Sequence, residues 1–359
     1  MAKVATLMPQ RPWTNRGVGF ALLAAVLFGV SAPFAKLLLR AASPQLLAGL
    51  LYLGSGVGLT LVWFIRRNRP REAPLTRRDA PWLAAAIAFG GVLGPLLLMA
   101  GLTRTPAASA SLLLNLEGVF TALIAWFVFR ENFDRRIALG IAAIVAGGVV
   151  LSWEGQANFG QVAGPLLVVA ATLCWAIDNN FTQKISAGDP VQTAMLKGLV
   201  AGSINTAMGL ALGGSLPPVP RLFAASLLGF LSYGVSLVLF VLALRRLGTA
   251  RTGAYFSSAP FVGAAVSLMV FRERPSLAFG AGAALMALGV WLHLTEHHEH
   301  AHQHGLMEHD HLHVHDEHHQ HEHAASDAPG EPHSHPHRHE PMVHTHAHYP
   351  DIHHRHGHD

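Results

Sequence analysis

An apolar stretch of membrane-spanning length occurs twice in this chain, in the same register. Residues 111–131 read SLLLNLEGVFTALIAWFVFRE, and residues 253–273, which lie 142 positions later, read GAYFSSAPFVGAAVSLMVFRE. The two copies align without a gap and both end in Phe-Arg-Glu. Further matched positions are Arg104 on Arg246, Ala108 on Ala250, Gly140 on Gly282 and Gly147 on Gly289. A register shared over this length predicts two copies of one structural unit.

The composition places this duplicated unit in a membrane. Of the 359 residues, 51% are hydrophobic and 13% are charged, which is typical of membrane proteins. The net charge of +4 does not indicate a nucleic-acid partner, because the basic residues lie in short segments between apolar runs. The one cysteine, Cys174, excludes an internal disulfide.

Apolar windows of about twenty residues, each long enough to cross ~30 Å of hydrocarbon, recur along the chain. The sequence therefore predicts an all-α membrane protein with ten transmembrane helices in two sets of five. The first set is 17–39, 44–65, 81–102, 107–129 and 137–153, and the second is 162–181, 190–212, 222–244, 252–271 and 275–294. Residues 1–16 are expected to form a cytoplasmic lead.

The Lys and Arg residues of the short loops predict the orientation in the membrane. With the N-terminus inside, 16 of them fall in inner segments and five in outer loops, which indicates that both termini are cytoplasmic and that the protein lies in the plasma (bacterial inner) membrane. An odd number of helices per unit turns the second copy over relative to the first. The chain is thus predicted to contain an inverted repeat, as many secondary transporters do.

The motifs NLEGVFTALIAWFVFRE and SSAPFVGAAVSLMVFRE, with the preceding segments TRTPAASAS and RRLGTARTGA, resemble those of EamA-type transporters of the drug/metabolite transporter superfamily. The resemblance implies an EamA-like five-helix repeat over 17–153 and another over 162–294. It also implies secondary transport of a solute with no required cofactor. The second copy departs from the first in having Ala259 where the first has Glu117.

Two carboxylates inside the apolar helices are the main site candidates, because an ionisable residue at membrane depth is costly and commonly functional. Glu117 is expected near the middle of its helix as a proton or cation site. Asp178 is expected on one helix face with Cys174 and Thr182, at spacings of four residues. The alternatives are a protonated, hydrogen-bonded Glu117 and a merely hydrated Asp178.

For the other polar residues of the helices, the sequence allows both a role in the transport pathway and a purely structural role. Lys36 and Lys197 are expected mainly to extend their ammonium groups to the interface, and the alternative is that they neutralise a carboxylate or hold an anionic substrate. Asn205 and Tyr233 line the pathway or bond between helices. The complete set of pathway candidates is Glu117, Asp178, Asn115, Asn179, Asn180, Lys36 and Cys174.

The tail, residues 295–359, contains 24 of the 25 histidines, many of them at every second position. Imidazole is a ligand for nickel, copper and zinc, and a segment with so few apolar residues is expected to be disordered without metal. A solvated extension that binds metal only incidentally is the alternative. The predicted ligands are His309, His311, His313, His315, His333, His335, His337, His339, His344, His346 and His348.

Three functions remain open on the sequence. The leading one is proton-coupled export of nickel or cobalt, for which Glu117, Asp178 and Asn179 would supply oxygen ligands while the tail binds a divalent transition metal. The second is export of a small organic metabolite or amino acid with a tail that buffers or senses metal, and the third is a non-transporting membrane metal sensor. Enzyme activity is not expected, because no nucleophile and base accompany the carboxylates. A homodimer is among the assemblies that remain open.

Overall fold

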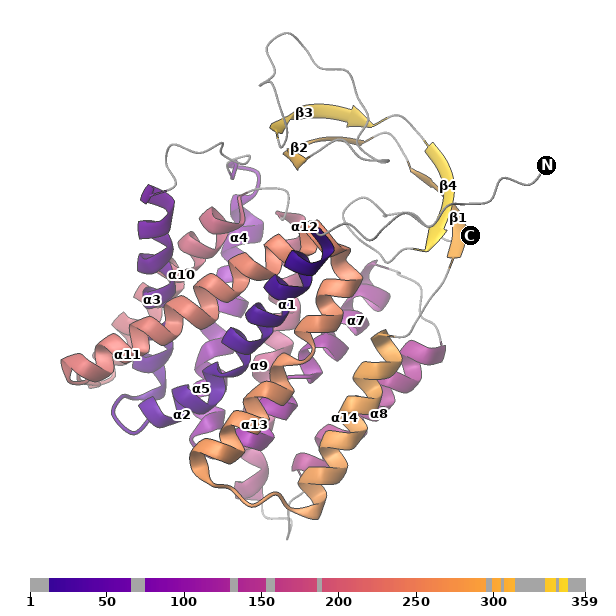
Figure 1. The fold of residues 1–359 in the computed structure, drawn as a ribbon. Helices are drawn as coiled ribbons and strands as arrows, with labels where there is room; N and C mark the ends of the chain where they lie inside the picture. The colour runs from indigo at the N-terminus through magenta and orange to yellow at the C-terminus, as the bar shows by residue number, and fades with distance from the viewer. Residues whose placement is uncertain are drawn as a thin grey trace.

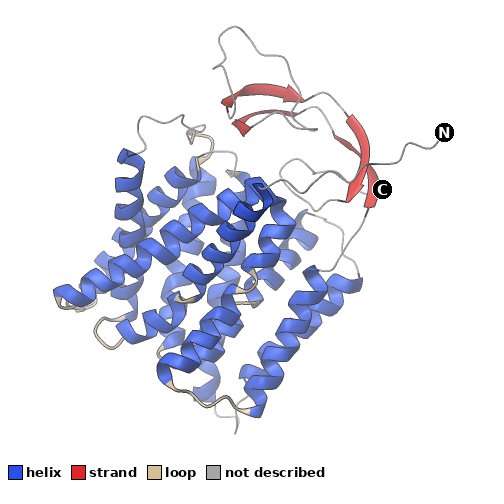
Figure 2. Ribbon diagram, in the orientation of Figure 1, coloured by secondary structure: helices blue, strands red, loops and turns tan. Residues whose placement is uncertain are grey.

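The membrane part of the chain is a bundle of helices, and its tail carries a few short strands (Figures 1 and 2). The computed structural model describes residues 13–65, 75–129, 135–152, 159–185, 189–294, 299–304, 307–313, 333–339 and 342–347. The predicted ligands His315 and His348, and most of the predicted N-terminal lead, lie outside the described residues.

The helices of the first half follow the predicted windows closely. They are α1 (Trp13–Gly29), α2 (Ser31–Leu38), α3 (Pro44–Ile65), α4 (Ala80–Ala86), the π-helix η1 (Ile87–Leu93), α5 (Gly94–Leu102), α6 (Ala107–Leu113), α7 (Leu116–Phe129) and α8 (Arg135–Ser152).

The second half repeats this pattern. Its elements are α9 (Phe159–Lys184), α10 (Pro190–Ala211), α11 (Val219–Gly229), the π-helix η2 (Phe230–Val235), α12 (Ser236–Phe256), α13 (Ala259–Phe271) and α14 (Leu277–Leu294). Six of the described helical stretches are long and apolar enough to cross a membrane, and three apolar helices are shorter.

The duplication is visible in the irregular parts of the helices as well as in the sequence. Adding 142 to both ends of α8 gives both ends of α14, and η2 ends 142 residues after η1. A break separates α6 from α7 at residues 114–115, and another separates α12 from α13 at residues 257–258. Both breaks are tight turns, since Asn115 N bonds Leu112 O and Ser258 N bonds Tyr255 O.

Equivalent helices of the two halves pack against each other, α3 on α10 and α8 on α14. Glycines form these contacts: Gly147 of α8 lies against Gly282 of α14, and Gly289 lies against Gly140. The earlier glycine of α8 thus meets the later glycine of α14, so the two helices are antiparallel. Small residues allow helices to approach this closely. The inverted orientation of the two halves across a membrane stays a prediction.

Besides the break between α6 and α7 within the predicted helix 107–129, a helix boundary in the second half differs from the sequence prediction. A loop was expected at residues 245–251, by analogy with the Thr103–Pro106 turn of the first copy, but α12 continues to Phe256. The first copy has Pro106, which disfavours helix at the residue before it, and the second has Gly248 at the matching position. Without the proline ring, the helix of the second copy is not interrupted there.

The tail also differs from the sequence prediction within its described residues. Where disorder was expected, the structure has β1 (Glu299–His304) paired antiparallel with β4 (Met342–Ala347), and β2 (Met307–His313) paired antiparallel with β3 (His333–His339). The alternation of histidine with other residues has the period of two that a strand requires, and a composition argument takes no account of this alternation.

Candidate functional site

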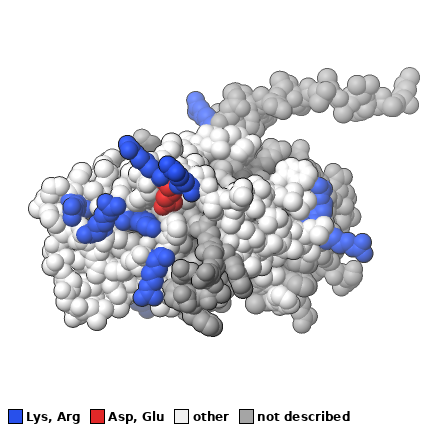
Figure 3. All heavy atoms as spheres, turned by 90° about the horizontal axis from the view of Figure 1, so that it is seen from below, with Lys and Arg blue, Asp and Glu red and all other residues white. Residues whose placement is uncertain are grey.

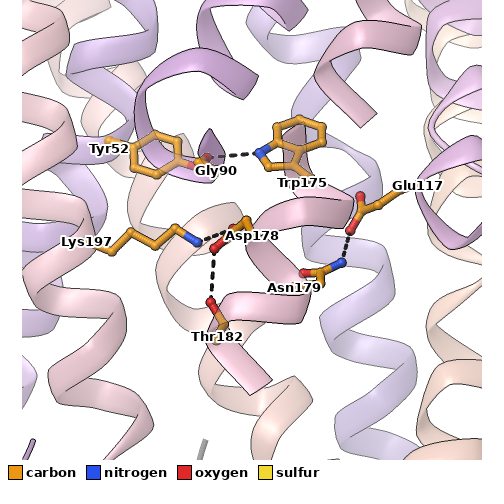
Figure 4. A network of polar contacts seen from close by, with 8 residues as sticks. All are labelled: Tyr52, Gly90, Glu117, Trp175, Asp178, Asn179, Thr182 and Lys197. Atoms are coloured by element: carbon orange, nitrogen blue, oxygen red, sulfur yellow. Dashed lines mark hydrogen bonds and ion pairs between the residues drawn. The ribbon is translucent and has the colours of Figure 1, made fainter. Parts of the chain in front are cut away.

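A network of polar side chains lies where α9 packs against η1 and α7, and Tyr52 of α3 and Lys197 of α10 contribute to it (Figure 4). It contains both carboxylates that the sequence singled out. These carboxylates come from different halves of the chain, and each makes a specific side-chain contact there.

Glu117 lies in the first turn of α7, directly after the break that ends α6. Its Oε1 accepts a hydrogen bond of 2.8 Å from Nδ2 of Asn179. The sequence placed Glu117 near the middle of one continuous helix, and that position was wrong because the helix is interrupted at Leu114 and Asn115. A carboxylate in the first turn interacts favourably with the unpaired backbone N–H groups and the positive end of the helix dipole.

Asp178 is buried, with 5% of its surface exposed, and both carboxylate oxygens have partners. Its Oδ1 accepts a hydrogen bond of 3.0 Å from Oγ1 of Thr182, one turn further along α9. Its Oδ2 forms an ion pair with Nζ of Lys197 on α10. The predicted shared face of Asp178 and Thr182 is thus present, and Asp178 is not merely hydrated at a helix end.

Lys197 has a different position from the one that the sequence favoured. Its position towards one end of α10 suggested an ammonium extended to the interface, yet only 12% of the side chain is exposed and it contacts Asp178. The close packing of α10 against η1, where Ala201 meets Gly91, holds the lysine inside the bundle. The second possibility considered for this lysine, neutralising a carboxylate, describes the structure.

The π-helix η1 supplies a backbone acceptor at the same place. The carbonyl of Gly90 accepts hydrogen bonds from the Tyr52 hydroxyl at 2.7 Å and from the Trp175 indole N–H at 3.0 Å. Carbonyls in π-helical turns are displaced from the regular helical ladder, and such turns are common at functional sites. A Cβ at Gly90 would overlap the carboxylate of Asp178, so only glycine allows η1 to lie this close.

Tyr52, Gly90 and Trp175 were not among the residues predicted from the sequence. A tyrosine and a tryptophan in the middle of apolar windows, each with a polar atom that needs a partner, were the available signal. Asn205 belongs to the same region: its Nδ2 donates to the Gly91 carbonyl at 3.1 Å. Its buried Oδ1 accepts no hydrogen bond from the described residues.

Other predicted pathway residues make local contacts instead. Asn115 donates to the Leu112 carbonyl, and Asn180 donates to the Ala176 carbonyl. Cys174 is half-buried one turn before Asp178 on α9. The structure therefore brings together Glu117, Asn179 and Asp178 from the predicted set, but gives Asn115 and Asn180 backbone partners of their own.

Lys36 lies in a separate cavity of about 540 Å³, at the end of the bundle where α2, α6 and the loop between α13 and α14 meet. Its ammonium donates to the Thr105 carbonyl and lies 5.9 Å from the centre of the Phe271 ring. The cavity lining also includes Arg104, Glu273 and Arg274. Seen from this end, acidic side-chain atoms lie next to several basic side chains (Figure 3). Lys36 thus lines a polar cavity and does not neutralise Glu117.

The network can bind opposite charges and exchange a proton. Within the described membrane part, no group of three or more His, Cys, Asp or Glu side chains is arranged to hold a metal ion. Glu117 and Asp178 offer negative groups, and Lys197 offers a positive one. The hydroxyl of Thr182 and the amide of Asn179 add neutral hydrogen-bonding groups.

Comparison with known proteins gives a consistent result. The sequence model of the EamA-like transporter family matches residues 15–153 and again residues 162–295. An uncharacterized transporter of Methanothermobacter thermautotrophicus is 29% identical over 287 residues, which cover 76% of this chain and 84% of the relative. A probable amino-acid metabolite efflux pump of Salmonella typhimurium is 29% identical over 299 residues, which cover 78% and 95%.

A solved crystal structure has a similar fold, with a TM-score of 0.57 and 18% sequence identity over 76% of this chain and 95% of the other. Two matches of one family model to the two halves of the chain, with apolar helices throughout, identify a multi-pass membrane protein. The chain belongs to the EamA-like transporter family.

Proposed function

We propose that this chain exports a small organic zwitterion, of the size and chemistry of an amino acid, in exchange for protons. The observation that carries the proposal is the presence of opposite charges at one place. The largely buried Asp178–Lys197 ion pair lies beside the Glu117–Asn179 hydrogen bond, in which Glu117 is partly exposed and Asn179 is exposed. A similar protein is named as a probable amino-acid metabolite efflux pump.

The arrangement suits a zwitterion because each of its charges has a counterpart. The substrate carboxylate would bind Lys197 in place of Asp178, and the substrate ammonium would bind Glu117 or the released Asp178. The interrupted helix contributes the N-terminus of α7 at this point, as discontinuous helices do at the binding sites of other secondary transporters. Protonation of Glu117 would weaken its hold on the ammonium and release the substrate.

Nickel or cobalt export receives less support from the geometry. Asp178, one of the oxygen ligands expected from the sequence, is paired with an ammonium. Like unit charges ~4 Å apart repel by about 4 kcal/mol at an effective dielectric constant near 20, so a divalent cation at Asp178 would be opposed by Lys197. Asn179 directs its N–H, and not its carbonyl, to Glu117.

We place the protein in the bacterial plasma membrane with both ends in the cytoplasm, on the basis of the basic residues in the expected inner segments. In that orientation, the cavity lined by Lys36, Arg104 and Glu273 opens to the outside. It would then serve as the exit for substrate released from the polar network around Asp178 and Glu117.

Proteoliposomes with a pH-sensitive dye inside test the function directly. Individual L-amino acids, NiCl₂ and CoCl₂ are added to vesicles with and without the protein, and proton movement is recorded. We expect one or more amino acids, and neither metal, to drive proton movement that depends on the protein. Metal-driven proton movement without an amino-acid response would overturn the proposal in favour of metal export, and no response to any probe would favour the sensor.

A further inference from the structure

We propose that the cavity around Lys36 binds the headgroup of a phospholipid. Its basic side chains would hold the phosphate, and Glu273 would hold the ammonium of an ethanolamine headgroup. The site lies outside the polar network of α9 and does not depend on the identity of the transported solute. A headgroup and a departing substrate would occupy the cavity in turn.

The cavity lies at the ends of the membrane-spanning segments. Its lining comes from the last turn of α2, the turn before α6, the first residues of α6, and the loop between α13 and α14 (Figure 1). The first three of these segments lie at or within a few residues of Leu38, Leu102 and Ala107, where apolar stretches long enough to cross a membrane end or begin. We therefore expect the cavity at the depth of the lipid headgroups.

The side chains of the lining carry an excess of positive charge. Lys36, Arg104 and Arg274 contribute three positive charges, and Glu273 contributes one negative charge. Within the described part of the chain, Glu273 forms no ion pair with any of the three. Positive charges gathered in a cleft attract an anion, and arginine is well suited to phosphate because its guanidinium can donate two parallel hydrogen bonds.

The backbone between α13 and α14 is strained at this place. Arg272, which ends α13, has left-handed dihedral angles, with φ 52° and ψ 35°, and this conformation is unfavourable for a residue that has a Cβ atom. Strained residues of this kind cluster at functional sites. The turn at Arg272 leads directly to Glu273 and Arg274, and both of these belong to the cavity lining.

Apolar surface beside the charged groups favours a lipid over a soluble anion. Leu268 and Phe279 belong to the lining, and the neighbouring side chains of Met269 and Leu277 are 70% and 95% exposed. The acyl chains of a phospholipid would cover this apolar surface, which is favourable because the surface is removed from water. Free phosphate has the same charge chemistry but would leave the apolar surface uncovered.

Glu273 selects among phospholipids. It is half-buried, and it is the acidic residue among the described residues of the lining. Its carboxylate would accept hydrogen bonds from the ammonium of phosphatidylethanolamine. Phosphatidylglycerol has the same phosphate but no positive group, so this lipid would leave the carboxylate without a partner and would be repelled by it.

Native mass spectrometry of the purified full-length protein, titrated in detergent with phosphatidylethanolamine, tests the site. Arg104→Ala with Arg274→Ala removes two exposed cations, and we expect lipid binding at least about tenfold weaker, because charge-assisted hydrogen bonds to the phosphate are lost. Arg221→Ala is the matched control, since this exposed arginine of α11 is expected on the same side of the membrane and is outside the lining. Binding that is unchanged in the double variant, or equally weakened in Arg221→Ala, would overturn the proposal.

Two further arms of the same titration identify the ligand. Glu273→Gln should weaken binding of phosphatidylethanolamine and strengthen binding of phosphatidylglycerol, and an equal change for both lipids would overturn the role of Glu273. A large excess of inorganic phosphate should leave phosphatidylethanolamine bound to the wild type. Displacement of the lipid by inorganic phosphate would make the cavity a site for a soluble anion and would overturn the lipid assignment.

Discussion

At the scale of single residues, Glu117 is the group to which we assign proton exchange. Glu117→Gln keeps the size of the side chain and can still pair with Asn179, so insertion and folding should be unaffected. Because the amide cannot exchange a proton at this position, export driven by a pH gradient should fall to the level of empty vesicles. Wild-type export rates in Glu117→Gln, measured at equal protein content, would make Glu117 a packing residue.

The Asp178–Lys197 pair should show strong coupling when its charges are removed. Breaking a buried ion pair by removing one partner typically costs about 3–5 kcal/mol, because a buried charge is left uncompensated. We therefore expect Asp178→Asn and Lys197→Met each to unfold more easily in detergent, and the double variant to recover much of the loss. Thermal unfolding curves of the wild type, the two single variants and the double variant form a double-mutant cycle. If the stability losses of the single variants simply add in the double variant, the two side chains do not form a direct pair.

Gly90→Ala tests the close approach of η1 to α9. The new methyl group would overlap the Asp178 carboxylate, and overpacking of this kind costs about 1–3 kcal/mol. Gly118→Ala is the matched control, because the same methyl group on α7 meets no atom within 4 Å. We expect reduced thermal stability and export for Gly90→Ala and wild-type behaviour for Gly118→Ala, with both measured in the same vesicle assay.

The sequence predicted part of this site and could not have predicted the rest. Glu117 and Asp178 were recognisable because a carboxylate in an apolar window is rare, and Thr182 followed from helical spacing. Lys197 and Gly90 come from other helices, and their roles depend on which faces of α10 and η1 pack towards α9. Helical period within one segment carries no information about that packing.

At the scale of elements, the helices themselves were largely predictable because each is a long apolar window. The break between α6 and α7 was not, since residues 107–129 are predominantly apolar and contain no proline. Tight turns and the side-chain bond from Asn115 to the Leu112 carbonyl produce it. The matching break before α13 suggests that the sequence repeat preserves a backbone feature and not only hydrophobicity.

The starts of α8 and α14 give a direct test of the inverted repeat. Arg135 and Leu277 occupy the same position in the two copies and both are exposed. Cysteines placed there, in protein with Cys174→Ser, should react with a membrane-impermeant maleimide from opposite sides of the membrane. Labelling of both from the same side would mean that the two copies run in parallel.

At the scale of the whole molecule, the two halves contact each other through equivalent helices. Because α3 packs on α10 and α8 on α14, the surface that one half presents is of the same kind as the surface it meets, as in a symmetric dimer. This packing could not be predicted from the sequence, because a sequence repeat predicts two similar units but not which of their helices contact each other.

With a symmetric interface of this kind, we expect the two halves to assemble even when the peptide chain between them is cut. The connection would act mainly by raising the local concentration of one half near the other, while the antiparallel glycine contacts of α8 with α14 provide the recognition. Residues 1–156 and 157–359, produced together as separate chains, should therefore co-purify and export substrate, and neither should do so alone. Under the predicted inverted topology, the contacts now made within one chain are those that two copies of one half, inserted in opposite directions, would have needed as separate proteins.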